Sequence, residues 1–223
     1  MNFDFLSETE LFGGCQPEDI RQMAASLNLH TARYPKGSVI FEAGTAITNI
    51  GLVLSGSVQI SHHDYWGNKS ILAIAKEGEI FAEAYACIPG ERLMIEASAN
   101  ELSEIVFISV PDLLQPFQNT GNSLHLQNRI IQNLVVISAR KNLHLARRSL
   151  HTAPKTIRER LLSYFSQLIS EQGSSRITVP FNRQQMADYL NLDRSALSKE
   201  LGRMKKEGLL DYRKNTFVIK TQP

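Results

Sequence analysis

The stretch FNRQQMADYLNLDRSALSKELGRMKKEGLL, residues 181–210, contains two short amphipathic patterns separated by three residues. Asn182 is suited to cap the first pattern as a helix, because Gln185 three places on completes a capping box. Asp193 is suited to cap the second, where its charge also favours the helix dipole. Gly208 fits the position at which this second helix ends. The stretch therefore predicts two helices joined by a tight turn.

The second predicted helix has an apolar side and a polar side. Leu197, Leu201 and Met204 lie within about 60° of one another at 100° per residue. The opposite side combines long cations with short hydroxyls: Arg194, Ser195, Ser198 and Lys199. A helix about 10–12 Å wide fits the major groove of B-DNA, where arginine bonds guanine O6 and N7, lysine reaches guanine or phosphate, and serine reads bases less selectively. We therefore expect these four residues to read DNA bases.

Further basic and polar residues flank this helix. Asn182 and Arg183 begin the first helix, and LLDYRKNTFVIK (residues 209–220) reads as a two-stranded hairpin with Arg213 and Lys214 near its tip. We expect these four side chains to contact the phosphate backbone. The alternative is a solvated basic face on a small helical domain, but two capped helices, a tight turn and a basic hairpin in that order favour DNA binding.

The charge of the chain is divided unevenly along its 223 residues. Residues 1–137 hold 7 basic and 15 acidic side chains, a balance of −8, whereas residues 138–223 hold 17 and 7, a balance of +10. Such asymmetry predicts two modules, of which the basic one is suited to nucleic acid. The sequence has no apolar run long enough for a membrane span and no basic start typical of a secretory signal. Two distant cysteines, Cys15 and Cys87, favour a cytoplasmic protein with ordinary thiols.

The acidic module reads as a set of short strands. Residues 38–41, 50–54, 57–61, 70–75 and 104–108 are rich in β-branched and aliphatic side chains. Glycines recur between these segments at intervals of about 7–12 residues, where tight turns need positive φ. Evenly spaced strands with glycine corners predict an antiparallel barrel or roll, preceded by a short helix over residues 17–29.

A long helix is predicted over residues 122–148. Its broad apolar stripe can bury against the β-roll and a partner helix at once, although an ordinary core helix would show a similar pattern. The residues expected at a dimer seam are Leu124, Ile131, Leu134 and Leu145. Pro154 then marks a break and suits the first turn of a third helix, which Ser149 or Thr152 could cap and which ends near Gly173.

Here the sequence resembles the Crp/Fnr transcription regulators, whose helix-turn-helix is matched closely by RQQMADYLNLDRSALSKELGRMKKEGLL. The resemblance implies an α+β chain with three parts: an effector-sensing β-roll over residues 1–121, a dimerisation helix and hinge over 122–150, and a winged helix-turn-helix over 151–223. It also implies a homodimer that reads near-palindromic duplex DNA, with RNA polymerase as a further partner. Ser195 stands where well-known members carry glutamate, so we expect either a different preferred half-site or less strict reading of one base pair.

The resemblance implies an effector site in the stretch GEIFAEAYACIPGERLMIEASA, residues 78–99. Family members that bind cyclic nucleotides carry a Gly-Glu pair and an Arg-Ser pair here, for ribose and phosphate. Glu83 occupies the glutamate position, but Ala82 replaces the glycine, and Glu91 and Arg92 fall roughly at the Arg-Ser pair. A carboxylate beside a phosphate is repulsive. We therefore expect these three charged residues to line a pocket for a small molecule other than cyclic AMP, or to pair with one another; a cyclic-nucleotide response is the alternative.

Other cofactors and classes fit the sequence less well. An iron–sulfur cluster needs about four thiolates, and the chain has two cysteines. Six scattered histidines are more typical of surface or capping residues than of haem ligands. A cupin-like metalloenzyme with a helical tail would need ligands on neighbouring strands, whereas the adjacent His62 and His63 would point to opposite faces. We therefore expect no enzyme activity, no iron–sulfur cluster and no haem.

Overall fold

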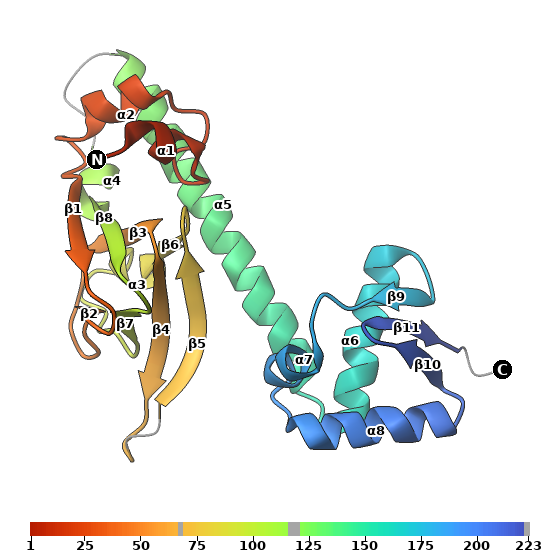
Figure 1. The fold of residues 1–223 in the computed structure, drawn as a ribbon. Coiled ribbons are helices and arrows are strands. Elements are labelled where there is room, and N and C mark those ends of the chain that lie inside the picture. The colour runs from red at the N-terminus through yellow and green to blue at the C-terminus, as the bar shows by residue number, and fades with distance from the viewer. Residues whose placement is uncertain (67–68, 116–120, 221–223) are drawn as a thin grey trace. The chain divides into compact units, whose positions relative to one another are not determined.

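The computed structural model describes residues 1–66, 69–115 and 121–220, which form two compact units (Figure 1). Unit 1 comprises Met1–Arg140 and unit 2 comprises Lys141–Pro223. Helix α5, Gly121–Thr152, contributes to both. None of the helices in the described ranges is long and apolar enough to cross a membrane.

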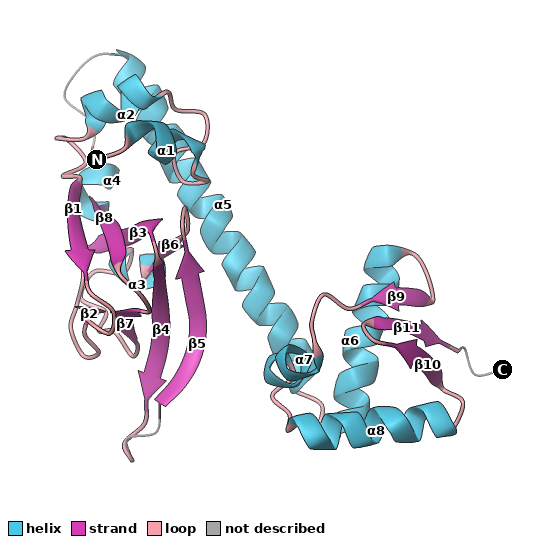
Figure 2. Ribbon diagram, in the orientation of Figure 1, coloured by secondary structure: helices cyan, strands magenta, loops and turns pink. Residues whose placement is uncertain are grey.

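Unit 1 contains two antiparallel sheets of four strands each, shown in magenta in Figure 2. One sheet has the order β1-β8-β3-β6 and the other β2-β7-β4-β5. The strands are β1 His30–Tyr34, β2 Val39–Phe41, β3 Asn49–Ser55, β4 Ser57–His63, β5 Lys69–Lys76, β6 Ile80–Phe81, β7 Glu96–Ala99 and β8 Ser103–Ser109. The short helices are α1 Phe3–Glu8, α2 Pro17–Met23, α3 Glu83–Ala86 and α4 Val110–Leu114. The predicted β-roll is confirmed, although α2 is shorter than the helix expected over residues 17–29.

Strands β3 and β8 are buried on both faces. Alternate side chains of a strand point to opposite faces of its sheet. Ile50 and Leu52 therefore join the core formed with the helices, while Val53 joins a second core that includes residues of both sheets. This double burial explains why IGLVL and EIVFI read as nearly continuous apolar runs rather than as alternating ones.

Three phenylalanine side chains contribute to the second core of unit 1. The ring centroid of Phe41 lies 5.7 Å from those of both Phe81 and Phe107. The Phe81 ring lies against Gly51 so closely that a Cβ at Gly51 would be 2.3 Å from it. Glycine is therefore required in the middle of β3 by close packing and not by a turn.

The first half of α5 is anchored to unit 1. Leu126, Ile130 and Leu134 are buried in the core with α1, α2 and α4. The buried side-chain amide of Gln127 donates to the carbonyls of Leu113 and Gln115 at 2.7 and 2.6 Å. Leu134 is therefore a core residue of its own unit, whereas the sequence placed it at a dimer seam.

Unit 2 is a three-helix bundle with a small sheet. Its elements after α5 are α6 Ile157–Gln172, β9 Arg176–Thr178, α7 Arg183–Tyr189, α8 Arg194–Lys206, β10 Leu210–Arg213 and β11 Thr216–Ile219. The sheet has the order β10-β11-β9 and is antiparallel. This arrangement confirms the predicted winged helix-turn-helix. A single apolar core that includes Phe165, Leu201 and Phe217 holds the helices on the sheet.

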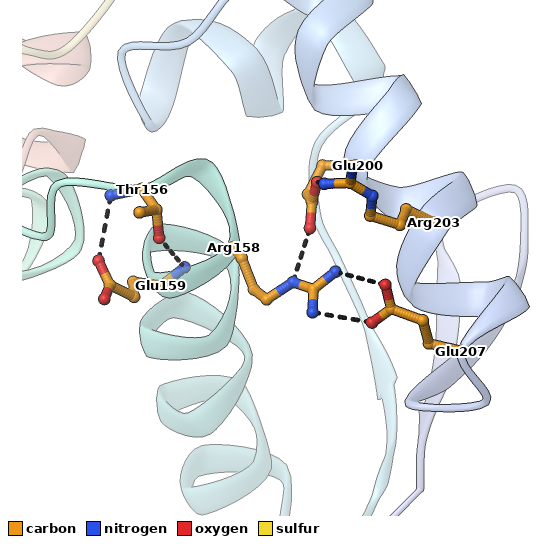
Figure 3. A network of polar contacts seen from close by, with 6 residues as sticks. All are labelled: Thr156, Arg158, Glu159, Glu200, Arg203 and Glu207. Carbon is orange, nitrogen blue, oxygen red and sulfur yellow. Dashed lines mark hydrogen bonds and ion pairs between the residues drawn. The ribbon is translucent and has the colours of Figure 1, made fainter.

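The boundary between α5 and α6 differs from the sequence prediction. Helix α5 continues to Thr152, and α6 begins only at Ile157. The cap of α6 is Thr156, whose hydroxyl accepts from the N–H of Glu159 at 3.2 Å (Figure 3). The Glu159 carboxylate accepts in return from the N–H of Thr156 at 3.1 Å. The capping box decides the start of the helix, so Pro154 precedes it and neither Ser149 nor Thr152 caps it.

Candidate nucleic-acid interface

Side-chain caps fix the start of each helix in the helix-turn-helix. The Asn182 side-chain oxygen accepts from the N–H of Gln185 at 2.9 Å, and the Gln185 side chain accepts from the N–H of Asn182 at 3.0 Å. Asp193 accepts from the N–H of Ala196 at 2.8 Å and from the hydroxyl of Ser195. Hydrogen bonds from the Ser195 hydroxyl and then from the Ala196 N–H lower the pKa of Asp193. A charged carboxylate therefore stands at the start of α8, where the helix dipole favours it.

The turn between the two helices is held by two arginines that the sequence did not single out. Arg148, on α5, donates to the carbonyls of Tyr189 and Asp188 at 3.0 and 2.9 Å. Arg160, on α6, donates to the carbonyls of Leu190 and Asn191 at 3.2 and 3.0 Å. Four successive carbonyls at the end of α7 therefore have charged donors.

The exposed side of α8 carries the four predicted base-reading residues. Leu197, Leu201 and Met204 are fully buried beneath the helix. Arg194, Ser195, Ser198 and Lys199 are all exposed. Within the described ranges neither Arg194 nor Lys199 has an ion-pair partner. The N-terminal half of α8 thus presents two free cations and two hydroxyls to solvent.

Several charges in the C-terminal half of α8 are paired within unit 2, and Figure 3 shows those around Arg158. Arg158, on α6, contacts Glu200 at 2.6 Å and both carboxylate oxygens of Glu207 at 2.8 and 3.0 Å. The hydrogen bond from Arg158 lowers the pKa of Glu207 and raises that of Arg158. Lys205 pairs with Asp211 on β10 at 2.5 Å. These contacts join α8 to α6 and to the wing, which is the β10–β11 hairpin. The paired charges of α8 begin at Glu200, and Lys206 near the end of the helix is exposed.

The predicted phosphate-contacting residues differ in exposure. Arg213 and Lys214 are exposed at the β10–β11 turn, where Lys214 has a φ of 54°. Asn182 is exposed, and its side chain is already bonded as the cap of α7. The guanidinium of Arg183 is half-buried, lies over two aromatic rings and donates to the Lys214 carbonyl. Arg213 and Lys214 are therefore free to meet a partner, while Arg183 is occupied within unit 2.

The three charged residues predicted for the effector site also differ from one another. Glu83 is buried at the start of α3, directly after Ala82, which adopts a φ of 64°. Glu91 and Arg92 are exposed, and Arg92 donates to the carbonyl of Gly44 at 2.8 Å. Ala82 thus keeps a left-handed conformation that normally favours glycine. Among the described residues, no group of three or more His, Cys, Asp or Glu side chains is placed to hold a metal ion.

Sequence profiles of known families match both units. The profile described as "Cyclic nucleotide-binding domain" matches residues 31–120, and the profile described as "Crp-like helix-turn-helix domain" matches residues 159–222. The chain belongs to the Crp/Fnr family of transcription regulators. It is thus a Crp-like regulator with a sensor-type domain and a DNA-binding-type domain, and this family consists of regulators rather than enzymes.

Individual Crp/Fnr relatives are distant in sequence. The cAMP-activated global transcriptional regulator CRP of Haemophilus influenzae is 22% identical over 190 residues, which cover 85% of this chain and 84% of that protein. The solved structure of the c-di-GMP responsive global regulator CLP of Xanthomonas campestris has a TM-score of 0.55 at 22% identity, covering 92% of this chain and 99% of its own. The structure of CprK complexed with OCPA has a TM-score of 0.58 at 20% identity, covering 92% of each chain. These similarities show that the chain shares its fold with these two structures.

Proposed function

We propose that this regulator acts as a cytoplasmic homodimer that reads near-palindromic duplex DNA through α8 and changes its DNA affinity when unit 1 binds a small effector. The observation that carries this proposal is the exposed N-terminal face of α8, where Arg194 and Lys199 have no ion-pair partner among the described residues, whereas Glu200 and Lys205 further along are paired. One such helix per subunit would enter successive major grooves, with half-site centres about 34–36 Å apart.

Ser195 contributes to this reading as a hydrogen-bond acceptor. The Ser195 hydroxyl donates a hydrogen bond to the Asp193 carboxylate, and an ionised carboxylate can only accept hydrogen bonds. The serine oxygen therefore keeps only lone pairs for a base, and it suits the exocyclic amine of cytosine or adenine in the major groove. Asp193 in this way gives Ser195 part of the acceptor character that glutamate has in the family members considered above.

The dimer is supported by the exposed apolar residues of α5. Several large side chains on this helix are more than half exposed: Leu124, Val135, Val136, Leu143, Leu145 and Leu150. Of the four residues expected at the seam, Leu124 and Leu145 belong to this set, Ile131 is partly buried against the unit 1 core and Leu134 is buried in it. A second copy of α5 is the occupant that a long helix with such a face favours. We therefore assign dimerisation to α5, which in the chain connects the proposed sensing unit 1 to the proposed DNA-reading unit 2.

An effector other than cyclic AMP is supported by the contacts within unit 1. The Phe41 ring packs on the rings of Phe81 and Phe107 inside the roll, and Arg92 is bonded to a main-chain carbonyl. The relatives named above are described with cAMP, c-di-GMP and OCPA, so one fold accommodates different effectors. The second candidate, a cyclic-nucleotide response, is favoured by the domain match over residues 31–120. We further propose that RNA polymerase is a partner of this regulator. We also propose that the protein carries neither an iron–sulfur cluster nor haem.

Two measurements test the proposed function. Selection of bound sequences from a random duplex library should return an inverted repeat whose half-sites are about 10–10.5 base pairs apart, and sedimentation should give twice the mass of the 25.0 kDa chain. Mass spectrometry of small molecules retained by gently purified protein should identify the effector, with cyclic AMP titrated in parallel. A lasting monomer that retains no sequence from the library contradicts the proposal, and saturable cyclic AMP binding would favour the second candidate.

A further inference from the structure

Arg183, at the first position of α7, is embedded in the base of the wing. Its guanidinium carbon lies 5.0 Å from the ring centroid of Tyr212 on β10 and 4.9 Å from that of Phe217 on β11. Its Nη2 donates to the main-chain carbonyl of Lys214 at 3.1 Å. Stacking on two rings and a hydrogen bond beyond them fix the guanidinium plane, which lysine could not reproduce.

Arg183 is more buried than the exposed cations Arg213 and Lys214. Desolvation lowers the pKa of its guanidinium. Its Nη1 is inaccessible to solvent and has no hydrogen-bond partner among the described residues. A phosphate oxygen therefore cannot approach that nitrogen without displacing the wing. The geometry matches a support for the hairpin rather than a side chain extended toward DNA.

The carbonyl that Arg183 holds belongs to a residue in an unusual conformation. Lys214 has a φ of 54°, which is unfavourable for a residue with a Cβ. Strand β10, which precedes this turn, is also tied to α8, because the Lys205 side chain pairs with Asp211 and lies 5.3 Å from the Tyr212 ring centroid. Helices α7 and α8 thus each place one cation on Tyr212, and Arg183 alone of the two reaches past it to the turn.

We infer that Arg183 is a positioning residue: it holds the β10–β11 turn so that Arg213 and Lys214 face the DNA backbone, and it acts on DNA through them. This inference rests on the proposed function of the wing in contacting phosphate. It replaces the sequence-based expectation that Arg183 itself contacts phosphate.

A double-mutant cycle on the full-length protein tests this inference. The proteins are the parent, Arg183→Gln, Lys214→Asn and the double variant. Asparagine removes the Lys214 charge and tolerates the left-handed conformation. Arg176→Gln, which removes an exposed cation on β9, controls for net charge. The probe is a 30-base-pair duplex of fixed sequence, since phosphate contacts do not depend on sequence, and affinity is measured by fluorescence anisotropy over a range of salt concentrations.

Lys214→Asn should lower the slope of log affinity against log salt by about 1 per subunit, and Arg183→Gln by about 1–2 because it displaces both wing cations. The double variant should then match Arg183→Gln. Hydrogen exchange without DNA should show faster exchange over residues 210–219 in Arg183→Gln but not in Lys214→Asn or Arg176→Gln.

Two results would overturn the inference. A double variant whose slope falls by the sum of the two single changes would mean that Arg183 contacts phosphate itself. Unchanged exchange over residues 210–219 in Arg183→Gln would mean that the wing does not depend on it. A parent protein that ignores the duplex even in dilute salt is a different result, because it contradicts DNA binding as a whole, and the exchange measurement would still show whether Arg183 orders the wing.

Discussion

Units 1 and 2 differ in how their candidate functional charges are used. On α8, Arg194 and Lys199 have no ion-pair partner among the described residues, while Lys205 pairs with Asp211. In unit 1, Glu83 is buried, Arg92 is bonded to a carbonyl, and Phe81 and Phe107 lie in the core that includes residues of both sheets. The exposed cations of α8 can thus meet a partner without breaking an ion pair, whereas Arg92 of the predicted effector site is already bonded within unit 1.

The largest expected effect is the loss of stability caused by substitutions in the separate apolar cores of the two units. Phe165 is 1% exposed and its ring lies 4.9 Å from that of Phe217. Phe165→Ala should destabilise unit 2 by about 3–5 kcal/mol, and Phe107→Ala should do the same to unit 1. Calorimetry with hydrogen exchange should assign each loss to its own unit. If either variant lowered the stability of both units equally, the two cores would not be independent.

The next effect concerns the free cations. Arg194→Ala should weaken binding to the selected site by about 1–3 kcal/mol and relax the preference at one base pair, because a bidentate guanine contact is lost. Arg213→Ala should weaken all sequences alike, since a phosphate contact carries no base information. Anisotropy on a panel of single-base variants distinguishes the two. An Arg194→Ala protein with unaltered preferences at every position would remove the base-reading assignment.

A smaller effect is expected on the stability of unit 2 at low pH. Hydrogen bonds and ion pairs lower the pKa of Asp193, Glu207 and Asp211, all in unit 2. Their contribution to stability is fully present above the unfolded pKa values, 3.8 for aspartate and 4.5 for glutamate, and is lost as the pH falls through the lower folded values. Thermal unfolding of unit 2 between pH 7 and pH 3 should therefore shift to lower temperature.

Asp193→Asn provides the matched control for this acid dependence. Asparagine is a good N-cap but does not titrate, so the variant should keep α8 and show a shallower pH dependence. An identical pH profile in the parent and in Asp193→Asn would mean that this carboxylate does not contribute to acid sensitivity.

The smallest effect is expected from a substitution in unit 1. Ala82 adopts a φ of 64°, so Ala82→Gly should relieve backbone strain and stabilise unit 1 by about 0.5–1 kcal/mol. Chemical denaturation of the parent and the variant measures this difference. A loss of stability would show that the Ala82 methyl group contributes more by packing than its backbone conformation costs.

Local signals were sufficient to predict much of unit 2. The caps Asn182 and Asp193 depend on residues only three places away, and both form as expected. Strand β7 was not predicted, because its sequence EASA lacks β-branched and aromatic residues and is made a strand by its neighbours β2 and β4. The cap at Thr156 was missed because Ser149 and Thr152 are equally plausible by composition.

Long-range contacts account for the remaining differences in the site. Arg148 and Arg160 donate to carbonyls 30 to 41 residues away, and a main-chain carbonyl leaves no trace in the sequence. The position of Arg183 was predicted correctly on α7, but its stacking on Tyr212 and Phe217 depends on the fold of the hairpin. The fold class was thus readable from patterns, whereas the partner of each charge was not.

The contact between Gly51 and Phe81 has an evolutionary consequence. Because the ring leaves no space for even a methyl group on β3, the two positions cannot change independently. A lineage in which residue 81 becomes small should tolerate alanine at position 51, and one that keeps phenylalanine should keep glycine. Covariation of these two positions among descendants of the same ancestor would therefore show which proteins have a tightly packed roll interior and which have space there for a small molecule.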